Sequence, residues 1–445
     1  MPSIPLTPAE EAYALKRLGL NSLDDLFSSN PPRIREKAKL SFDCDQGMSE
    51  HELRQFFGAM ASKNQKFTTH FLGGGIYDNV IPALVGQLTL RGEFLTCYTP
   101  YQPEISQGTL AAIFEFQTLI SRLTQMPVAN ASMYDGASAM AEAVTMAQRL
   151  SSADRSDVLL AASLPPDYLA VTKTFLKGHA NEPILVPWAT DGTIDLDALE
   201  RLDRSHKPCA IVVGYPNYFG IIENLEAVRS ITKALLIVSV ADPSALGLFE
   251  APGNFGADAV CGEAHQFGTP MGFGGPHCGF FATRKEFLRQ MPGRLVGETV
   301  DNRGQRAYTL TLSTREQHIR REKATSNICT NQGLIALRAA IYLSFLGKAG
   351  LARLAEINYS LLDYLRESLA TQGVHLRFPN SVHYREAVFD LPDMDLRFAK
   401  ALSNGVVPGI RLNKSFGQDF KNSLLICVHP KIGRSHIDQL VRLLA

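Results

Sequence analysis

Several features are missing from this 445-residue sequence, and each absence excludes a class of protein. The 44 lysines and arginines are balanced by 44 aspartates and glutamates, so no net charge attracts nucleic acid or an anionic membrane. No run of 18 apolar residues is free of charge, and the N-terminus has neither a basic segment nor a long apolar one. We therefore expect no transmembrane span, no secretory signal and no nucleic-acid partner.

Paired cysteines are also missing. The seven cysteines are scattered, odd in number and never spaced as CxxC; they are Cys44, Cys97, Cys209, Cys261, Cys278, Cys329 and Cys427. This usage predicts neither a disulfide framework nor a metal site, and it favours a reducing, cytoplasmic compartment.

The length exceeds what one hydrophobic core usually supports, so we expect more than one lobe. Residues 1–68 have the pattern of a helical arm. Thr7 with Glu10, and Ser49 with Glu52, have the spacing of helix capping boxes. An arm of this size cannot form a core of its own and is expected to pack on a larger body or on a partner.

Residues 69–330 alternate helical segments with short, continuous apolar runs, at 158–163, 184–188, 209–215, 235–240, 258–262 and 278–283. Apolar runs without polar alternation are typical of strands that are covered on both faces. The fold class is therefore α/β, with a mostly parallel sheet between layers of helices. Residues 331–445 predict a smaller α+β C-terminal domain that begins with a long helix and ends with another.

A turn of small residues, Gly136, Ala137 and Ser138, opens directly into a helical segment. Backbone N–H groups at such a helix start can approach an anion closely, and the helix dipole favours negative charge there. An ordinary helix cap explains the same residues.

Asp242 follows the apolar run 235–240. A carboxylate at the carboxyl end of a central strand lies on the ligand side of an open α/β sheet. Pyridoxal-phosphate enzymes use an aspartate there to keep the pyridine nitrogen protonated. The alternative is an Asp-Pro-Ser turn that caps the next segment.

The third feature is a missing lysine. In the large domain of fold-type I pyridoxal-phosphate enzymes, the aspartate aminotransferase-like fold, the Schiff-base lysine follows the aspartate by about two dozen residues. His265 stands 23 residues after Asp242, and no residue from 234 to 284 is lysine. Lys233 and Lys285 flank this interval, and either would require a different sheet order. An imidazole cannot form the covalent bond to the cofactor, so the chain has the scaffold without its nucleophile.

Six segments together resemble the glycine decarboxylase P-protein family of the glycine cleavage system, and more narrowly subunit 1, the α chain, of its two-chain form. They are LNSLDDLF, FLGGGIYDNVIPALV, YTPYQPEISQG, NASMYDGASAMAEA, FGTPMGFGGPH and REKATSNICTNQGL. The resemblance implies a subunit of glycine dehydrogenase (aminomethyl-transferring). In that enzyme pyridoxal phosphate is expected on the partner, subunit 2 or β chain, in an α2β2 assembly. The complex decarboxylates glycine and transfers its aminomethyl group to the lipoyl arm of the H-protein.

By this resemblance no residue of the chain is itself catalytic, and His265 stands near the position of the missing lysine. Gly136, Ala137, Ser138 and Asp242 become a vestigial cofactor pocket. Enzymes of this fold close each active site with loops of the neighbouring chain. Candidate loops here contain Gly73, Gly74, Gly75, Tyr98, Tyr101, Gln102 and Glu104. The alternative for the second loop is a proline-rigidified segment packed on the sheet.

Two other hypotheses remain open. A stand-alone binding protein could use the vestigial pocket for an anionic ligand without any second chain. A self-sufficient decarboxylase would need a lysine outside the expected interval, and Lys323 is then the candidate.

Overall fold

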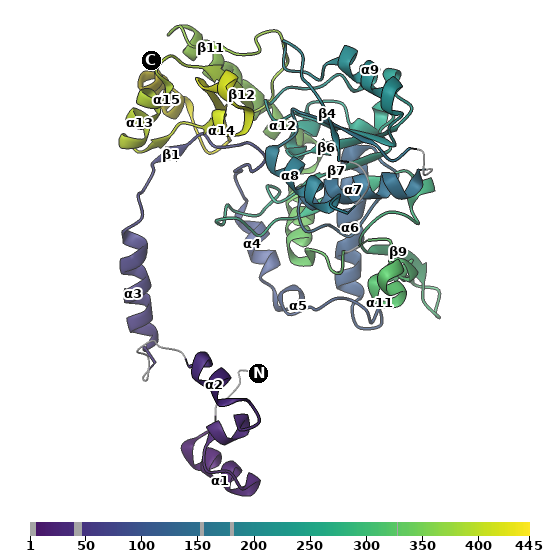
Figure 1. Cartoon of the computed structure of the whole chain (residues 1–445), viewed down its shortest axis with the longest axis vertical. Coiled ribbons are helices and arrows are strands. Elements are labelled where there is room, and N and C mark those ends of the chain that lie inside the picture. Colours follow the sequence, from purple (N-terminus) through teal and green to yellow (C-terminus); the bar gives the residue numbers. More distant parts are fainter. Residues whose placement is uncertain (1–5, 40–46, 152–154, 179–181, 327) are drawn as a thin grey trace. The chain divides into compact units, whose positions relative to one another are not determined.

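The computed structural model describes residues 6–39, 47–151, 155–178, 182–326 and 328–445, so Cys44 lies outside the described residues. The described chain forms two compact units, Met1–Lys66 and Phe67–Ala445 (Figure 1). The division within the second unit at residue 331 remains a prediction.

The described residues of the first unit form four short helical segments: α1 (Pro8–Leu18), η1 (Leu23–Phe27), α2 (Pro32–Ala38) and α3 (Glu50–Ser62). Both predicted capping boxes are confirmed. Thr7 N–H donates to Glu10 Oε2 at 2.8 Å, and Ser49 N–H donates to Glu52 Oε2 at 2.8 Å. Each pair satisfies donors at the helix start that otherwise have no partner.

A seven-stranded sheet forms the centre of the second unit, in the order β2-β8-β7-β6-β5-β3-β4. The strands are β2 (Val128–Ala129), β3 (Val158–Ala161), β4 (Ile184–Val186), β5 (Ala210–Gly214), β6 (Leu235–Val240), β7 (Ala259–Glu263) and β8 (Gly279–Thr283). The five strands from β7 to β4 are parallel, and β8 runs antiparallel to β7 and to β2. The predicted mostly parallel sheet and its six apolar runs are confirmed.

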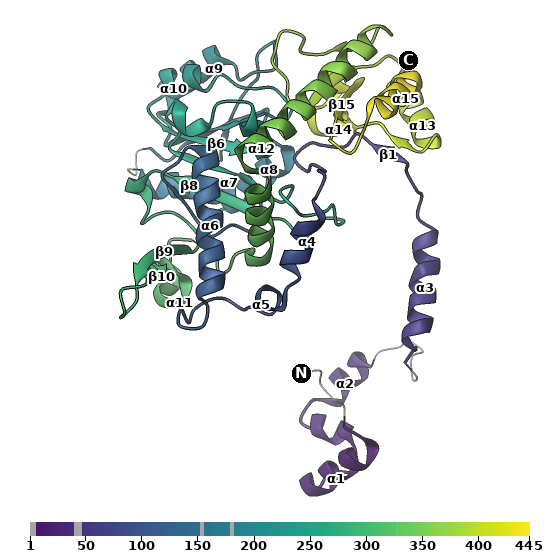
Figure 2. The same cartoon turned by 180° about the vertical axis from the view of Figure 1, so that it is seen from behind.

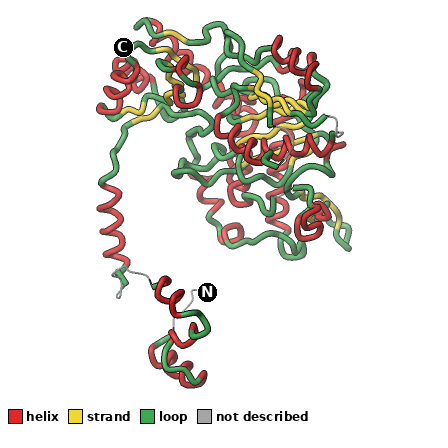
Figure 3. The backbone as a smooth tube through the Cα atoms, viewed as in Figure 1, coloured by secondary structure: helices red, strands yellow, loops and turns green. Residues whose placement is uncertain are grey.

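Helices surround this sheet, which lies between them in Figure 3. They are α6 (Gln107–Thr124), α7 (Gly136–Leu150), α8 (Pro166–Phe175), α9 (Leu196–His206) and α10 (Leu225–Ile231). Helix α7 is buried along most of its length, because it begins with small residues that let it pack closely on the sheet. Its close packing fixes the helix start at the carboxyl edge of the strands.

The C-terminal part contains a second sheet, β11-β12-β15-β14, whose hydrogen-bonded neighbours are all antiparallel. Its strands are β11 (His375–Leu376), β12 (Glu386–Asp390), β14 (Ile410–Arg411) and β15 (Ser423–Cys427), with helices α13 (Met394–Ser403) and α15 (Arg434–Leu444) packed on them. Strand β1 (Thr69–His70) pairs in parallel with β13 (Val406–Val407), which ties the start of the unit to its end.

Helix α12 (Gly333–Ala370) is the one helix, among the described residues, that is long and apolar enough to span a bilayer by length and composition alone. It contains a residue with non-helical backbone, Gly347, and its inner face belongs to the core through Ile335, Ala339 and Tyr342. Figure 2 shows it beside α6. Since the core helices of globular proteins have the same composition, α12 is explained by its packing.

One hairpin was not expected from the sequence. Strands β9 (Leu295–Val300) and β10 (Arg306–Thr311) pair antiparallel and pack on α6. The remaining short helices are α4 (Ala83–Thr89), α5 (Gly92–Leu95), α11 (Gln317–Arg320), α14 (Asn413–Phe416), η2 (Pro243–Gly247), η3 (Pro252–Phe255), η4 (Lys285–Phe287), η5 (Ser313–Arg315), η6 (Arg321–Lys323) and η7 (Gln418–Phe420).

Candidate functional site

The carboxyl ends of β6 and β7 bring Asp242 and His265, which the sequence singled out, together with Glu263, which it did not. Asp242 follows β6, Glu263 is the last residue of β7, and His265 comes two residues later; all three are buried. The start of α7 lies at the same edge, because Gly136 N–H donates to Glu263 Oε2 at 3.1 Å. This edge is where ligands bind in open α/β sheets.

Asp242 is only 2 % exposed, and neighbouring side chains bond both of its oxygens. Oδ1 accepts hydrogen bonds from the Ser244 hydroxyl at 2.6 Å and from Gln266 Nε2 at 3.3 Å. Oδ2 accepts a charge-assisted bond from Arg385 Nη1 at 3.0 Å. The carboxylate is therefore held in place and neutralised by residues of its own chain.

Arg385 immediately precedes strand β12 of the C-terminal sheet, and its side chain is fully buried. Besides Asp242, it donates to Val428 O at 3.1 Å, to Asn79 Oδ1 at 2.9 Å and to Asp78 O. Its guanidinium also lies 4.9 Å from the centre of the Tyr77 ring. Burial opposes its charge, but Asp242 and other neighbours outweigh burial and raise the pKa of Arg385 above its usual value. A buried pair of this kind is a fixed element of the fold.

Carboxylates of the chain itself satisfy the start of α7. Asp135 caps the helix by accepting from Ser138 N–H at 2.7 Å, and Glu263 accepts from Gly136 N–H. Ala137 and Ser138 are buried, and a Cβ placed on Gly136 would lie 2.1 Å from the Tyr168 hydroxyl oxygen. The alternative of an ordinary helix cap therefore describes this turn better than an open anion site does.

Glu263 ties several segments of this edge together. Its Oε1 accepts from the backbone N–H groups of His265 at 2.9 Å and Cys278 at 2.8 Å, and its Oε2 lies 3.4 Å from His277 Nδ1. Burial opposes its charge, but the nearby His277 side chain and the bond from the Cys278 N–H lower the pKa of Glu263. Burial lowers the pKa of His265, whereas the nearby Glu263 carboxylate raises that of His277.

These residues do not fit pyridoxal phosphate. The cofactor's pyridine nitrogen requires the Asp242 oxygen that Arg385 occupies, and its phosphate requires helix-start N–H groups that Asp135 and Glu263 already use. The missing lysine is not replaced from nearby. Lys233 lies before β6 and Lys285 lies after the antiparallel strand β8. Both are therefore at the edge of the sheet opposite Asp242 and His265, and both are exposed. Lys323 is exposed in η6.

The predicted loop with Tyr98 and Tyr101 extends into solvent. Tyr98 is 87 % exposed and Tyr101 is 51 % exposed, while Gln102 and Glu104 are exposed as well. The Tyr101 hydroxyl accepts a bond from Arg294 Nη2 at 2.7 Å, so one end of the loop is anchored to the fold. Packing on the sheet, the alternative reading of this loop, does not describe Tyr98.

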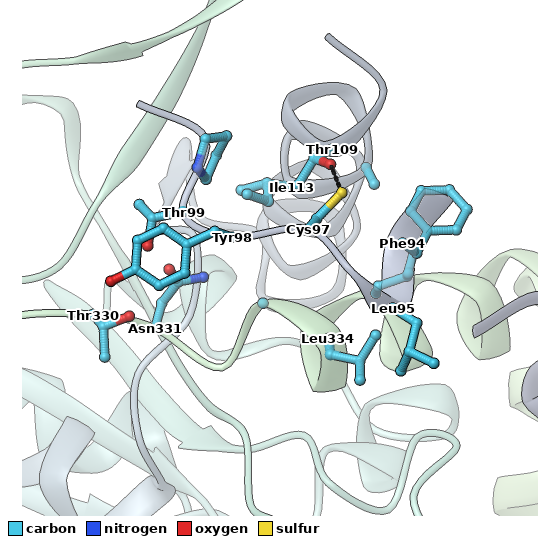
Figure 4. A pocket seen from close by; sticks show the side chains of 14 residues that line it. Phe94, Leu95, Cys97, Tyr98, Thr99, Thr109, Ile113, Thr330, Asn331 and Leu334 are labelled. Atoms are coloured by element: carbon cyan, nitrogen blue, oxygen red, sulfur yellow. Dashed lines mark hydrogen bonds between the residues drawn. The ribbon is translucent and has the colours of Figure 1, made fainter. Parts of the chain in front are cut away.

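A cavity of about 230 Å³ lies under this loop. Figure 4 shows Tyr98 beside Thr330 and Asn331 on one side of the cavity, and Leu95 and Leu334 on the other. Neither Asp242 nor His265 lines it, so the exposed loop and the buried polar cluster are separate features of the chain.

The loop that contains Gly73, Gly74 and Gly75, called the glycine loop below, is held by the C-terminal sheet. Gly74 N–H donates to Glu386 Oε2 at 2.8 Å, and a Cβ on Gly73 would lie 2.3 Å from the same oxygen. Gly74 and Gly75 have φ values of 68° and 106°, a region that favours glycine. These contacts explain the glycines by packing, and a role for Gly73, Gly74 and Gly75 toward a partner remains a prediction.

Sequence reasoning missed Arg385, Glu263 and His277. An arginine directly before the apolar strand of residues 386–390 is an unusual neighbour for a core strand, and this was the only signal for Arg385. Its partner Asp242 is 143 residues away, so only the fold reveals the pair.

Three comparisons agree on the family. A family model described as glycine cleavage system P-protein matches residues 1–444. The chain is 44 % identical over 446 residues to a probable glycine dehydrogenase (decarboxylating) subunit 1 of Aquifex aeolicus (strain VF5), covering 100 % of both chains. A protein of the same description from Anaeromyxobacter dehalogenans (strain 2CP-C) is 43 % identical and covers 99 % of this chain and 98 % of its own.

A crystal structure of glycine decarboxylase (P-protein) of the glycine cleavage system, in inhibitor-bound form, matches with a TM-score of 0.89 and 37 % identity, covering 100 % of this chain and 99 % of that chain. Glutamate decarboxylase of Lactobacillus brevis, at 12 % identity and a TM-score of 0.67 over 93 % of this chain and 95 % of its own, shares the fold alone. The predicted fold class is confirmed. By sequence and by structure, the chain belongs to the glycine cleavage system P-protein family.

Proposed function

We propose that this chain is the lysine-lacking subunit of a glycine-decarboxylating enzyme of the glycine cleavage system. Together with a second chain, subunit 2, it decarboxylates glycine and passes the aminomethyl group to the lipoyl arm of the H-protein. The proposal rests on family membership together with one observation: Arg385 forms an ion pair with the Asp242 carboxylate. The segment around Asp242, residues 234 to 284, contains no lysine.

Pyridoxal phosphate belongs on subunit 2 in this proposal, in a soluble cytoplasmic complex of α2β2 composition. The lack of fit in this chain supports that placement, because its own charges satisfy the groups that would anchor a cofactor. No step of the reaction is assigned to the buried cluster around Asp242.

The contribution of this chain to the reaction is the exposed loop. Tyr98, Tyr101, Gln102 and Glu104 offer two aromatic faces, hydrogen-bond groups and one carboxylate, and all four are exposed. Large exposed aromatic side chains beside a cavity are typical of surfaces that become buried in an assembly. The loop therefore packs against subunit 2 and completes its active site.

The test uses the full chain with and without the second chain. The full chain alone, incubated with pyridoxal phosphate and then with borohydride, is expected to carry no labelled lysine, and glycine-dependent carbon dioxide exchange is expected only after the second chain is added. A borohydride-labelled lysine in this chain would overturn the assignment. Full activity of a Lys323→Ala variant in the complex removes the self-sufficient alternative, and a stable homodimer that ignores subunit 2 would favour the stand-alone binding protein.

A further inference from the structure

Glu263, His265 and His277 bring a carboxylate and two imidazoles to one point of the carboxyl edge. Their donor atoms all lie within 4.8 Å of one another. Glu263 ends β7 and pairs with Gly279, the first residue of β8, so His277 stands two residues before that strand. Two hydrogen-bonded strand ends therefore fix both sides of the group.

The hydrogen bonds of Glu263 leave one position open. Its Oε1 accepts two backbone N–H groups and its Oε2 accepts one, from Gly136. A carboxylate has about four lone-pair sites, so one site on Oε2 remains, and His277 Nδ1 faces that oxygen at 3.4 Å. Backbone N–H groups bonded to a carboxylate are the outer contacts that orient metal-binding carboxylates.

His265 provides a second, independent observation. Its side chain is 3 % exposed, and its Nδ1 atom is buried without a hydrogen-bond partner within the described part of the chain. A buried imidazole nitrogen without a partner costs free energy unless a ligand satisfies it. Glu263 provides the carboxylate of this cluster, but its hydrogen bond with His265 is to the backbone N–H and does not involve the Nδ1 atom.

The cluster opens onto a cavity of about 440 Å³, which His265 and His277 both border. The glycine-rich loop from Met271 to Pro276 and the imidazole of His70 form other parts of its wall. An ion held by three protein ligands would therefore have its remaining position directed toward space for water or a small molecule.

We propose that Glu263, His265 and His277 bind one divalent transition-metal ion of the zinc class, with an open position toward this cavity. Two imidazoles and one carboxylate suit Zn²⁺ and Co²⁺, whose bonds to such ligands are about 2.0–2.2 Å long. Binding would draw the three donor atoms, now all within 4.8 Å of one another, closer together around the ion. The sequence-based expectation of no metal site depended on cysteine spacing, which has no bearing on these three residues.

The test is a titration of the chelator-treated full chain with Co²⁺, followed by its visible absorption and by calorimetry. The wild-type chain is expected to bind one Co²⁺ with the spectrum of imidazole and carboxylate ligands. His265→Ala and His277→Ala are expected to bind it at least tenfold more weakly. His70→Ala is the matched control, because it removes an imidazole from the same cavity outside the cluster, and it is expected to bind as the wild type does.

A second readout protects the test from variants that fold poorly. Saturating Zn²⁺ is expected to raise the melting temperature of the wild-type chain and of His70→Ala, but not that of His265→Ala. Absence of saturable Co²⁺ binding to the wild type, or equal binding by the wild type and both cluster variants, overturns the proposal. Loss of binding in His70→Ala would also overturn it, because the ion would then occupy a different site.

Discussion

The polar cluster around Asp242 and the loop from Tyr98 to Glu104 are opposites. In the cluster, a buried carboxylate, a buried arginine and a helix start bond to one another, while in the loop the large side chains face solvent. A site that still bound a cofactor would leave its anchoring groups available, whereas the loop leaves large aromatic side chains available for a partner. In the proposed function, the chain therefore keeps the fold of its family and contributes to the reaction through its surface.

The largest expected effect is on stability, from Arg385→Ala. The substitution leaves Asp242 buried without its charged partner, so the free energy of unfolding should fall by about 3–5 kcal/mol. Urea unfolding of the full chain measures the loss. Arg353→Ala removes an exposed pair with Glu356 and should cost less than about 1 kcal/mol.

Replacing both members of the buried pair sharpens this prediction. Asp242→Leu combined with Arg385→Met should recover most of the lost stability, because no charge is then left buried alone. A loss below about 1 kcal/mol for Arg385→Ala would show that the pair does not hold the cluster together.

The next effect depends on pH and concerns Glu386, which holds the glycine loop. Burial raises the pKa of Glu386 to about 7, so the folded chain keeps a proton that the unfolded chain releases near pH 4.5. Its contribution is therefore fully present below pH 4.5 and is lost as the pH rises to about 7. Relative to Glu386→Gln, the wild type should lose roughly 3 kcal/mol across this range.

Unfolding of both proteins by urea at a series of pH values measures the difference. Burial lowers the pKa of His383 and of His429 to about 4, but both histidines titrate in the wild type and in the variant and cancel in the comparison. A difference that does not change between pH 4.5 and 7 would contradict the raised pKa.

An intermediate effect is expected in the exposed loop, and it should appear in activity. Tyr98→Ala should change the free energy of unfolding by no more than about 0.5 kcal/mol, because the side chain is 87 % exposed. Glycine-dependent carbon dioxide exchange by the reconstituted complex should fall at least tenfold, about 1.4 kcal/mol. Tyr359→Ala, which removes an exposed tyrosine from α12, serves as the control and should leave exchange unchanged. Equal activity of the two variants would remove the loop from the proposed role.

The smallest effect is expected where the loop is anchored to the fold through Tyr101 and Arg294. Tyr101→Phe deletes the hydroxyl that accepts from Arg294, a loss of about 1 kcal/mol in the free energy of unfolding. Arg294 keeps its bonds to Cys329 O and Asn331 Oδ1, so the fold should persist and the loop alone should loosen. Faster amide hydrogen exchange confined to the loop would support this anchoring, and unchanged exchange would contradict it.

The sequence predicted what depends on local pattern. Continuous apolar runs located the strands of the central sheet, and the Thr7–Glu10 and Ser49–Glu52 spacings located two helix starts. The hairpin of β9 and β10 was not predicted, because its strands mix polar and apolar residues on a half-exposed surface.

Within the site, the sequence placed Asp242 and His265 at the correct edge but could not show what they contact. The partner of Asp242 comes from the C-terminal sheet, and the Glu263 carboxylate gathers backbone N–H groups from Gly136 and Cys278. Contacts between residues so far apart in the sequence leave no periodicity or spacing to read. A pattern can therefore predict an edge of a sheet more readily than the state of the groups that meet there.

The pair of Arg385 with Asp242 also has a mechanical consequence. It is a buried ion pair that links the end of β6 in the central sheet to the start of β12 in the C-terminal sheet. Sliding or swinging one sheet against the other would have to break it at a cost of about 3–5 kcal/mol, which keeps such an excursion below about one molecule in a hundred. The pair therefore opposes sliding or hinge motion between the two sheets, and in the proposed complex any opening and closing is expected of surface loops or of subunit 2.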